Sequence, residues 1–504
     1  MNFKTPIATL LLVNFWILGI YEYFFNPRVF VIEYEDAPKQ PWALTEPWKN
    51  YLSTLELKIK HQNIVNDNNY CEYVMNYQQD HLITLDQDGL PIKQQRIIFS
   101  DFNNNTFPKK ILNRISTLSM TEHFTRMNPE RHPYEKLKPN INLFFHHEPL
   151  WHEFHEIGKH FLCQGQRYNH IPGNENINYK DTTINTFRNY TKHYVGRMQC
   201  FNPWMVMPYS LDLSDENQCK EFFNRLNDDK DREGVNWVVK KSRYSHNGQG
   251  IQLIDSKTAH LALKEYDYGN KCNEAAGFLA QKYIKYPFLI NGKKFDFRAY
   301  MFIASMDPLI ILYHDGFARI TLDDYNSTSG DRSKHLTNLD VAQGFLESKN
   351  VTGKEKEEAL IDQGWSYQHL EEYLIENNLV KKGWMDSYLR ASIKRAMFHI
   401  VRMNLSKLLK HPGVFEIMGF DFILDQNLHL WFLEANLTPC ITEKNEMKKE
   451  LNTKFIKDVV DLEYALLYGA DFNKIFSRTN FQWIYDGRKK GMDRYHDLIT
   501  KDCL

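Results

Sequence analysis

The segment 420–436, FDFILDQNLHLWFLEAN, is the feature that most constrains the fold of this chain. Two apolar runs that are rich in aromatic and aliphatic residues flank a short polar stretch, a pattern typical of a β-hairpin. Glu434 and Asn436 lie two positions apart, so both side chains project from one face of the second strand. A carboxylate and an amide on one face of an otherwise apolar strand indicate a binding site.

A third oxygen-bearing side chain, Asp421, lies in the first strand of the hairpin. We expect a two-residue turn at 426–427, which would pair Asp421 with Phe432. That pairing places Asp421 diagonal to Glu434 on the same face, with about 7–8 Å between the backbones. A three-residue turn would reverse the face to which Asp421 points.

These oxygen ligands suit a divalent cation. Burying an unpaired carboxylate is costly, so a cation is expected beside Asp421 and Glu434. An oxygen-only set with few protein ligands suits Mg²⁺ that is held jointly with the phosphates of a nucleotide. The alternative is that Asp421 caps a turn while Glu434 pairs with a lysine.

Two stretches upstream carry residues that suit phosphate groups. In VVKKSRYSHNGQGI, Lys240 ends a strand before a loop with Gly248 and Gly250, and glycines let a backbone close over phosphates. The Walker pattern is absent, and the stretch alone is also typical of a hairpin turn with a solvated lysine.

In LINGKKFDFRAYMF, the side chains of Lys294, Asp296 and Arg298 alternate along a strand and share one face. Such a charged stripe is either the wet side of a half-buried sheet or a cradle for phosphate and ammonium groups. Arg319 adds a guanidinium near the end of another strand. The segment 334–340, KHLTNLD, is by itself typical of a cap or a turn.

A length of 504 residues predicts two or three linked subdomains. The β-rich runs lie at 236–241, 250–254, 277–284 and 295–306, and helical patterns lie at 386–409 and 451–467. We therefore expect an α/β fold of the α+β type, with mixed, largely antiparallel sheets and helices. Residues 27–160 form a polar, loop-rich N-terminal region.

Charge and cysteine usage exclude some classes of protein. The net charge is −1, from 62 Lys and Arg against 63 Asp and Glu, which favours no nucleic-acid partner. The seven cysteines are dispersed without a C-x-x-C pair and predict reduced thiols in a cytosol-like compartment. The N-glycosylation sequon at Asn436 falls on an expected metal ligand, which argues against a secretory lumen.

The N-terminus predicts a membrane attachment. Residues 5–21 carry no charge and reach the lower limit for a membrane-spanning helix. Aromatic residues follow up to position 25, as in an interfacial belt, and no A-x-A cleavage signal is present. An uncleaved anchor within residues 1–26 is expected, with a buried N-terminal helix as the alternative.

Taken together, the motifs resemble the tubulin tyrosine ligase-like family of ATP-grasp ligases. The matching stretches keep the family order between about residue 165 and residue 465: NHIPG, KD at 180–181, WVVKK…NGQGI, QKYI, LINGKKFDFRAYMF, GFARI, KHLTN, FEIMGFDFIL and WFLEAN. The resemblance implies an ATP-grasp-like fold with a nucleotide cleft between subdomains. Residues 165–470 would form the catalytic domain and residues 471–504 a C-terminal tail.

The resemblance also implies a role for each matching residue. Arg298, Arg319 and Asp296 would be catalytic, with Arg319 facing the carboxylate of the incoming amino acid. Mg²⁺ would be held by the three hairpin residues, Asp421, Glu434 and Asn436. ATP would be bound by the following residues, of which 281–284 form the adenine hinge: Lys180, Lys240, Asn247, Gly248, Gln281, Lys282, Tyr283, Ile284, Lys294, Asp296, Thr337 and Asn338.

The implied reaction phosphorylates a protein carboxylate with ATP, and the amine of a free amino acid then attacks the acyl phosphate. The expected partners are tubulin or microtubules, in the cytoplasm, the cytoskeleton or a cilium. Glutamate is the amino acid expected first, from its frequency in the family, which makes the chain polyglutamylase-like.

Three departures from the family pattern are present, and the last two bear on the amino acid. Lys241 stands where the family usually has proline, and Leu339 and Asp340 replace a Tyr-Ser pair of glutamate-adding relatives. Gly364 replaces a lysine before the Trp-Ser pair. The acid at Asp340 and the absence of a lysine at Gly364 disfavour binding of a glutamate side chain. The alternatives are a glycine or tyrosine ligase, a ligase for a protein other than tubulin, and a catalytically silent tubulin-binding module.

Overall fold

The computed structural model describes residues 86–90, 97–101, 120–123, 141–146, 166–194, 203–243, 248, 250–437, 439, 441 and 446–489. The predicted membrane segment at 5–25 lies outside these residues. Within the described residues, no helix has both the length and the apolar character needed to cross a bilayer.

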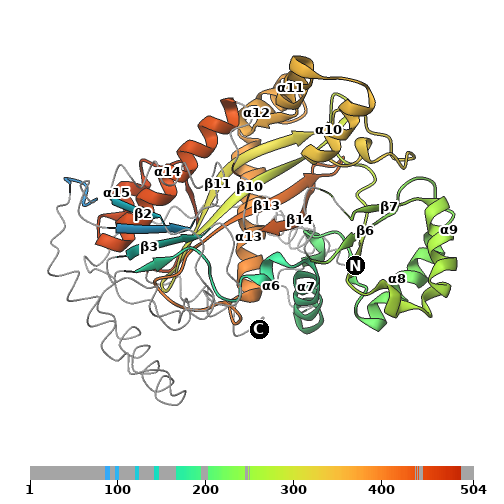
Figure 1. Ribbon diagram of the computed structural model, residues 1–504, viewed down its shortest axis with the longest axis horizontal. Helices are drawn as coiled ribbons and strands as arrows, with labels where there is room; N and C mark the ends of the chain where they lie inside the picture. Colours follow the sequence, from blue (N-terminus) through green and yellow to red (C-terminus); the bar gives the residue numbers. More distant parts are fainter. Residues whose placement is uncertain are drawn as a thin grey trace, which may run out of the picture.

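An antiparallel sheet of seven strands forms the centre of the molecule (Figure 1). Its main path runs β12, β11, β10, β13 and β14, with β15 paired to β11 and β9 paired to β10. The bounds are β9 Leu289–Ile290, β10 Lys293–Met306, β11 Leu309–Ile320, β12 Gly364–Ser366, β13 Glu416–Leu424, β14 Leu430–Asn436 and β15 Gln482–Asp486. The expected mixed fold with antiparallel strands is confirmed.

Helices cover both faces of this sheet, so the central strand β10 is buried on both sides. Phe295 and Phe297 pack in a core with residues of α7, α12 and α13. Tyr300 and Phe302 point the other way, into a core formed with α14 and α15. The bounds are α7 Lys180–Tyr194, α12 Tyr367–Glu376, α13 Ala391–Asn404, α14 Glu446–Tyr468 and α15 Phe472–Phe476.

A smaller lobe, at the right of Figure 1, carries a second antiparallel sheet in the order β5, β8, β6 and β7. Helices α8 and α9 pack on this sheet around a separate core. Asp215 caps α8 and Asp255 caps α9, each by accepting a backbone N–H of the first turn. The bounds are β5 Ser210–Asp212, β6 Trp237–Lys241, β7 Gln252–Ile254, β8 Phe278–Lys282, α8 Glu216–Asp229 and α9 Ser256–Glu265.

The remaining elements connect these parts. The pattern at 386–409 predicts one long helix, but a π-helical turn at Met385–Arg390 precedes α13, which ends at Asn404. Short elements include α6 Glu175–Asn178, α10 Leu339–Ser348 and α11 Gly353–Asp362. Single 3-10 turns lie at Pro203–Met205, Asp267–Gly269, Cys272–Ala275 and Arg332–Lys334.

The region expected to be loop-rich contributes three strands. They are β1 Ile97–Asp101, β2 Met120–His123 and β3 Ile141–His146, which pair in parallel and continue to β4 Arg167–Tyr168. These runs are short and lie among asparagine- and proline-rich segments, so no alternating pattern indicates them. At the other end, the predicted tail 471–504 includes α15 and the sheet strand β15.

The prediction of reduced cysteines is wrong for one pair. Cys219 of α8 and Cys272 form a disulfide with their Cα atoms 6.0 Å apart. Both side chains are buried in the core of the small lobe. They are 53 residues apart in sequence, so spacing gives no sign of the pairing.

Removing this disulfide should destabilise the protein. The bond closes a long loop, and cross-links of that span stabilise by about 4 kcal/mol in the chain-entropy model. We expect the Cys219→Ser, Cys272→Ser variant to lose several °C in the midpoint of thermal unfolding. Cys503→Ser, which removes a thiol outside the described residues, is the matched control. An unchanged midpoint in the double variant would contradict the pairing.

Candidate functional site

The hairpin of β13 and β14 differs from its prediction in two ways that cancel. Asp425 and His429 close a three-residue loop, in which Leu428 has a positive φ of 61°. A loop of this length by itself would turn the Asp421 side chain to the face opposite to that of Glu434. A β-bulge then lets β14 skip Leu433, so Asp421 lies directly opposite Glu434. The prediction that these two side chains share one face is confirmed, but the expected turn and the pairing with Phe432 are wrong.

The bulge also explains how the second strand presents its polar residues. Leu433 and Glu434, although adjacent, both line one cavity, and Asn436 lines it two residues later. Ala435, between them, packs into the core on the other face. An apolar lining residue and two potential metal ligands therefore come from a single short strand.

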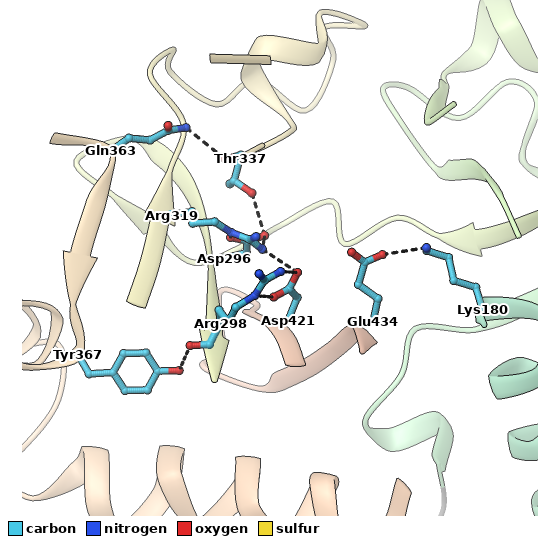
Figure 2. Close-up of polar contacts among 9 residues, drawn as sticks. All are labelled: Lys180, Asp296, Arg298, Arg319, Thr337, Gln363, Tyr367, Asp421 and Glu434. Carbon is cyan, nitrogen blue, oxygen red and sulfur yellow. Dashed lines mark hydrogen bonds and ion pairs between the residues drawn. The ribbon is translucent and has the colours of Figure 1, made fainter. Parts of the chain in front are cut away.

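Charged side chains of β10, β11 and β13 form one cluster at the end of the sheet (Figure 2). Arg298 donates two hydrogen bonds of 2.8 Å to Asp421, and Arg319 donates two of 2.7 Å to Asp296. Arg319 also lies 3.0 Å from Asp421, which joins the two pairs. Thr337 donates a 2.8 Å hydrogen bond to Asp296.

This cluster is buried, so the charged stripe is not the wet side of a half-buried sheet. Lys294, Asp296 and Arg298 are only 8%, 7% and 8% exposed. Burial by itself would raise the pKa of Asp421, but the charges of Arg298 and Arg319 outweigh it and lower the pKa to about 2. Asp421 is therefore an anion at neutral pH and balances two buried guanidinium groups.

A glycine makes this arrangement possible. Gly316 is the extra residue of a bulge in β11. It lies between Phe317 and Asp315, which pair with Arg298 and Ala299 of β10. A Cβ at this position would lie 2.2 Å from the carbonyl oxygen of Arg298. The same carbonyl accepts a 2.8 Å hydrogen bond from Tyr367. The close approach of β10 and β11 beside the cluster thus requires glycine.

Two further lysines reach the site from α7 and β6. Lys180, at the start of α7, lies 3.3 Å from Glu434. Lys240 of β6 donates a 3.0 Å hydrogen bond to Gln281 of β8. Burial lowers the pKa of Lys240 to about 8 and that of Lys294 to about 7, so both ammonium groups lack full compensation.

A cavity of about 400 Å³ brings these groups together between the small lobe and the central sheet. That volume is in the usual range of small-molecule sites. Asn247 lies outside the described residues. The other predicted residues all line this cavity: Lys180, Lys240, Gly248, Gln281, Lys282, Tyr283, Ile284, Lys294, Asp296, Arg298, Arg319, Thr337, Asn338, Asp421, Glu434 and Asn436. The ammonium group of Lys282 pairs with Asp229, and its backbone N–H donates a 2.8 Å hydrogen bond to the carbonyl oxygen of Tyr209.

Several lining residues were not predicted. The apolar ones are Val238, Ile251 and Leu253 from the small lobe and Ile423 and Leu433 from the hairpin. They can form the walls of a slot for a flat ring. The period-2 pattern of each strand marks them as one face of a sheet, but no pattern shows that the two sheets face each other.

The hairpin residues fit a magnesium ion by their chemistry. Asp421, Glu434 and Asn436 offer only oxygen ligands, which is the preference of Mg²⁺. In Asn436, Nδ2 is buried and, among the described residues, without a hydrogen-bond partner. No group of three or more His, Cys, Asp or Glu that could hold a metal occurs in the described part, so the amide oxygen of Asn436 would have to join Glu434 and Asp421, whose carboxylate also binds Arg298 and Arg319.

Two facing antiparallel sheets with a charged cavity between them are typical of the ATP-grasp type of fold. The chain belongs to the tubulin-tyrosine ligase family, whose model matches residues 159–470.

Comparison with curated proteins gives relatives of two kinds. The protein polyglycylase TTLL10 of Rattus norvegicus is 29% identical over 296 residues, which cover 55% of this chain and 41% of the relative. The inactive polyglycylase TTLL10 of Homo sapiens is 28% identical over 58% of this chain and 43% of its own length. The probable alpha-tubulin polyglutamylase Ttll1 of Tetrahymena thermophila is 27% identical over 62% and 75%. The chain thus spans about two fifths of the length of the polyglycylases it matches.

Proposed function

We propose that this protein is an ATP- and Mg²⁺-dependent ligase that joins a free amino acid to a carboxylate of a protein. The observation that carries the proposal is the convergence of lysines, two arginines and a magnesium-type ligand set on one cavity. The family to which the chain belongs supports the same class of reaction. Tubulin tails are the acceptor we put first, because relatives are named for tubulin.

Each group in the cavity has a chemical use in this reaction. Lys180 and Lys240 would hold the phosphates of ATP as point charges. Bound Mg²⁺, held by the hairpin residues, would neutralise charge on the transferring phosphoryl group. The acceptor carboxylate attacks the γ-phosphorus and ADP leaves. The amine then attacks the acyl carbon, phosphate leaves, and the amine loses a proton as the amide forms.

Arg319 suits the carboxylate of the incoming amino acid. Its Nε and one terminal nitrogen are bound by Asp296, and the second carboxylate, Asp421, contacts the same terminal nitrogen. No hydrogen bond from the other terminal nitrogen is found within the described residues. A planar guanidinium fixed on one edge in this way can receive a carboxylate on its other edge.

Turnover by this site can be tested through its first product. We expect release of ADP from ATP to require an acceptor protein, and repeated turnover to require a free amino acid as well. A site that binds Mg·ADP but never turns over ATP would instead support the silent-module alternative. That alternative has one observation in its favour, since a human relative is named inactive.

The identity of the amino acid depends on the start of α10. Leu339 and Asp340, which follow Asn338 in the sequence, line the cavity. Lys448 of α14 lines it as well. A glutamate side chain would bring a second carboxylate towards Asp340, whereas glycine has no side chain to place. Asp340 and the polyglycylase relatives favour glycine, while Lys448 and the polyglutamylase relatives favour glutamate.

Replacing Asp340 with serine separates these two candidates. Loss of the acid should raise kcat/KM for glutamate by about tenfold, because a repulsion of about 1 kcal/mol or more is removed. The value for glycine should stay within about twofold of the wild type, since no side chain reaches position 340. Competition between the two labelled amino acids measures both. Equal effects on both would show that residue 340 does not face the substrate side chain.

Nucleotide affinity should depend on pH. Lys294 and Lys240 have a pKa of about 7 and about 8 and bind phosphates only as ammonium ions. Nucleotide phosphates would raise both pKa values, so the complex holds more protons than the free protein and the affinity falls as pH rises. We expect the Kd for Mg·ATP to increase at least about tenfold between about pH 6.5 and about pH 8.5. Calorimetry in buffers of different ionisation enthalpy checks this, and binding without proton uptake would contradict it.

A further inference from the structure

A chain of hydrogen bonds runs from Lys294 into the wall of the cavity. Lys294 Nζ lies 2.9 Å from the hydroxyl of Tyr283. That hydroxyl lies 2.7 Å from Nδ1 of His335, and Nε2 of the same ring lies 2.6 Å from the carbonyl oxygen of Ser329. The chain of hydrogen bonds thus links Lys294 of β10 to Tyr283, which follows β8, and through it to His335, which follows the 3-10 turn Arg332–Lys334.

The chemistry of the two ends fixes the direction of every hydrogen bond in this chain. A carbonyl oxygen only accepts, so Nε2 of His335 carries the proton. Burial lowers the pKa of His335 to about 4, so its ring is neutral at physiological pH and Nδ1 is an acceptor. Tyr283 must then donate its only hydroxyl proton to His335. Its oxygen is left to accept from Lys294.

The chain is held rigidly. His335 is only 1% exposed, and its ring packs edge-on against Tyr283 and Tyr325, with centroids 5.5 and 5.4 Å away. Tyr325 is fixed in turn by a 2.7 Å hydrogen bond to the carbonyl of Lys285. The Lys294 ammonium also lies 4.6 Å from the centre of the Tyr283 ring, close enough for a cation–π contact.

We propose that Tyr283 and His335 are positioning residues, which hold the Lys294 ammonium at one point of the cavity wall and stabilise its protonated form. The inference rests on the proposed nucleotide site. A lysine side chain has four rotatable bonds, and ordering it before the nucleotide arrives reduces the entropy lost on binding. Without the tyrosine oxygen, the ammonium loses an acceptor in a place where water is scarce.

The charged groups around this chain of hydrogen bonds raise some pKa values of its members and lower others. Burial and Lys240 lower the pKa of Lys294, whereas Asp296 raises it. Lys294 and Lys334 disfavour a charge on His335, whereas the carbonyl of Ser329 and Asp331 favour it. Burial raises the pKa of Tyr283, and the neighbouring Tyr325 raises it further, so the phenol stays protonated. None of these neighbours reverses the direction of the hydrogen bonds.

The test compares four variants of the full chain by two measurements. One is the Kd for Mg·ADP by calorimetry. The other is the pH dependence of trace acetylation at Lys294, read by mass spectrometry, which does not depend on nucleotide. The variants are Tyr283→Phe, His335→Leu, His335→Asn and, as matched control, Tyr373→Phe, whose hydroxyl bonds to Asn291.

Tyr283→Phe and His335→Leu should each raise the Kd for Mg·ADP by about tenfold and move the acetylation midpoint of Lys294 to lower pH. His335→Asn keeps an acceptor near the position of Nδ1 and should stay close to the wild type, as Tyr373→Phe should. An acetylation midpoint that is unmoved in Tyr283→Phe would overturn the inference. If wild-type protein binds no nucleotide, the proposed function fails, while the acetylation result still decides the role of Tyr283 and His335.

Discussion

Glu434→Gln should lower amino-acid ligation on the order of 10²- to 10³-fold, the size of effect seen when one group that stabilises transition-state charge is removed. The change keeps the shape of the side chain and removes its charge. Glu434 is 29% exposed and pairs with Lys180 at 3.3 Å, so its loss costs the fold little. We expect the thermal midpoint to stay within about 2 °C of the wild type.

The matched control is Glu347→Gln. Glu347 pairs with Lys356 on the surface, at a side-chain exposure of 66%, and does not line the cavity. Its replacement should change neither activity nor stability. Retention of more than about a tenth of the activity in Glu434→Gln would remove this residue from the proposed metal site.

Asp421→Asn should have the largest effect on stability. Asp421 is the shared partner of Arg298 and Arg319, and its side chain is 4% exposed. Breaking a buried ion pair on one side leaves unpaired charge and typically costs about 3–5 kcal/mol. We expect a loss of this size in the free energy of unfolding, measured by urea denaturation at neutral pH.

An exposed acid provides the comparison for that loss. Asp231 pairs with His260 at the surface, where its side chain is 73% exposed, and Asp231→Asn should change stability by less than about 0.5 kcal/mol. The double variant Arg298→Met, Asp421→Asn should recover part of the loss, since one unpaired cation is then removed. A cost below about 1 kcal/mol in Asp421→Asn would contradict the buried cluster.

The hairpin shows which features of the site can be predicted from local sequence patterns. Period-2 alternation correctly places Glu434 and Asn436 on one face, because the bulge of β14 precedes both residues. The facing of Asp421 depends instead on loop length and on the bulge at Leu433. Neither follows from the hydrophobic pattern, and the two deviations happen to cancel.

Burial of the charged stripe could not be predicted from the sequence either. Lys294, Asp296 and Arg298 alternate as the exposed face of a half-buried strand would. The charged partners of Asp296 and Arg298 come from β11 and β13, 23 and 123 residues away along the chain. Only the pairing of those strands shows that opposite charges meet and can be buried together.

Pairings over long separations account for the other differences. The Cys219–Cys272 disulfide joins elements 53 residues apart, and the parallel strands β1 to β3 have weak local patterns. His335 lies in a segment typical of a turn, and its contact with Tyr283 spans 52 residues. Such contacts depend on the tertiary arrangement and leave no periodic signal.

The most direct measurement of the proposed ligase activity uses the full-length protein with ATP, Mg²⁺, tubulin and each amino acid separately, followed by mass spectrometry of the tubulin tails. We expect a mass increase of one or more glycine or glutamate residues on a tail carboxylate. The increase should depend on ATP and disappear in Glu434→Gln. Tails of unchanged mass with every amino acid, while Mg·ADP still binds, would contradict ligation to tubulin.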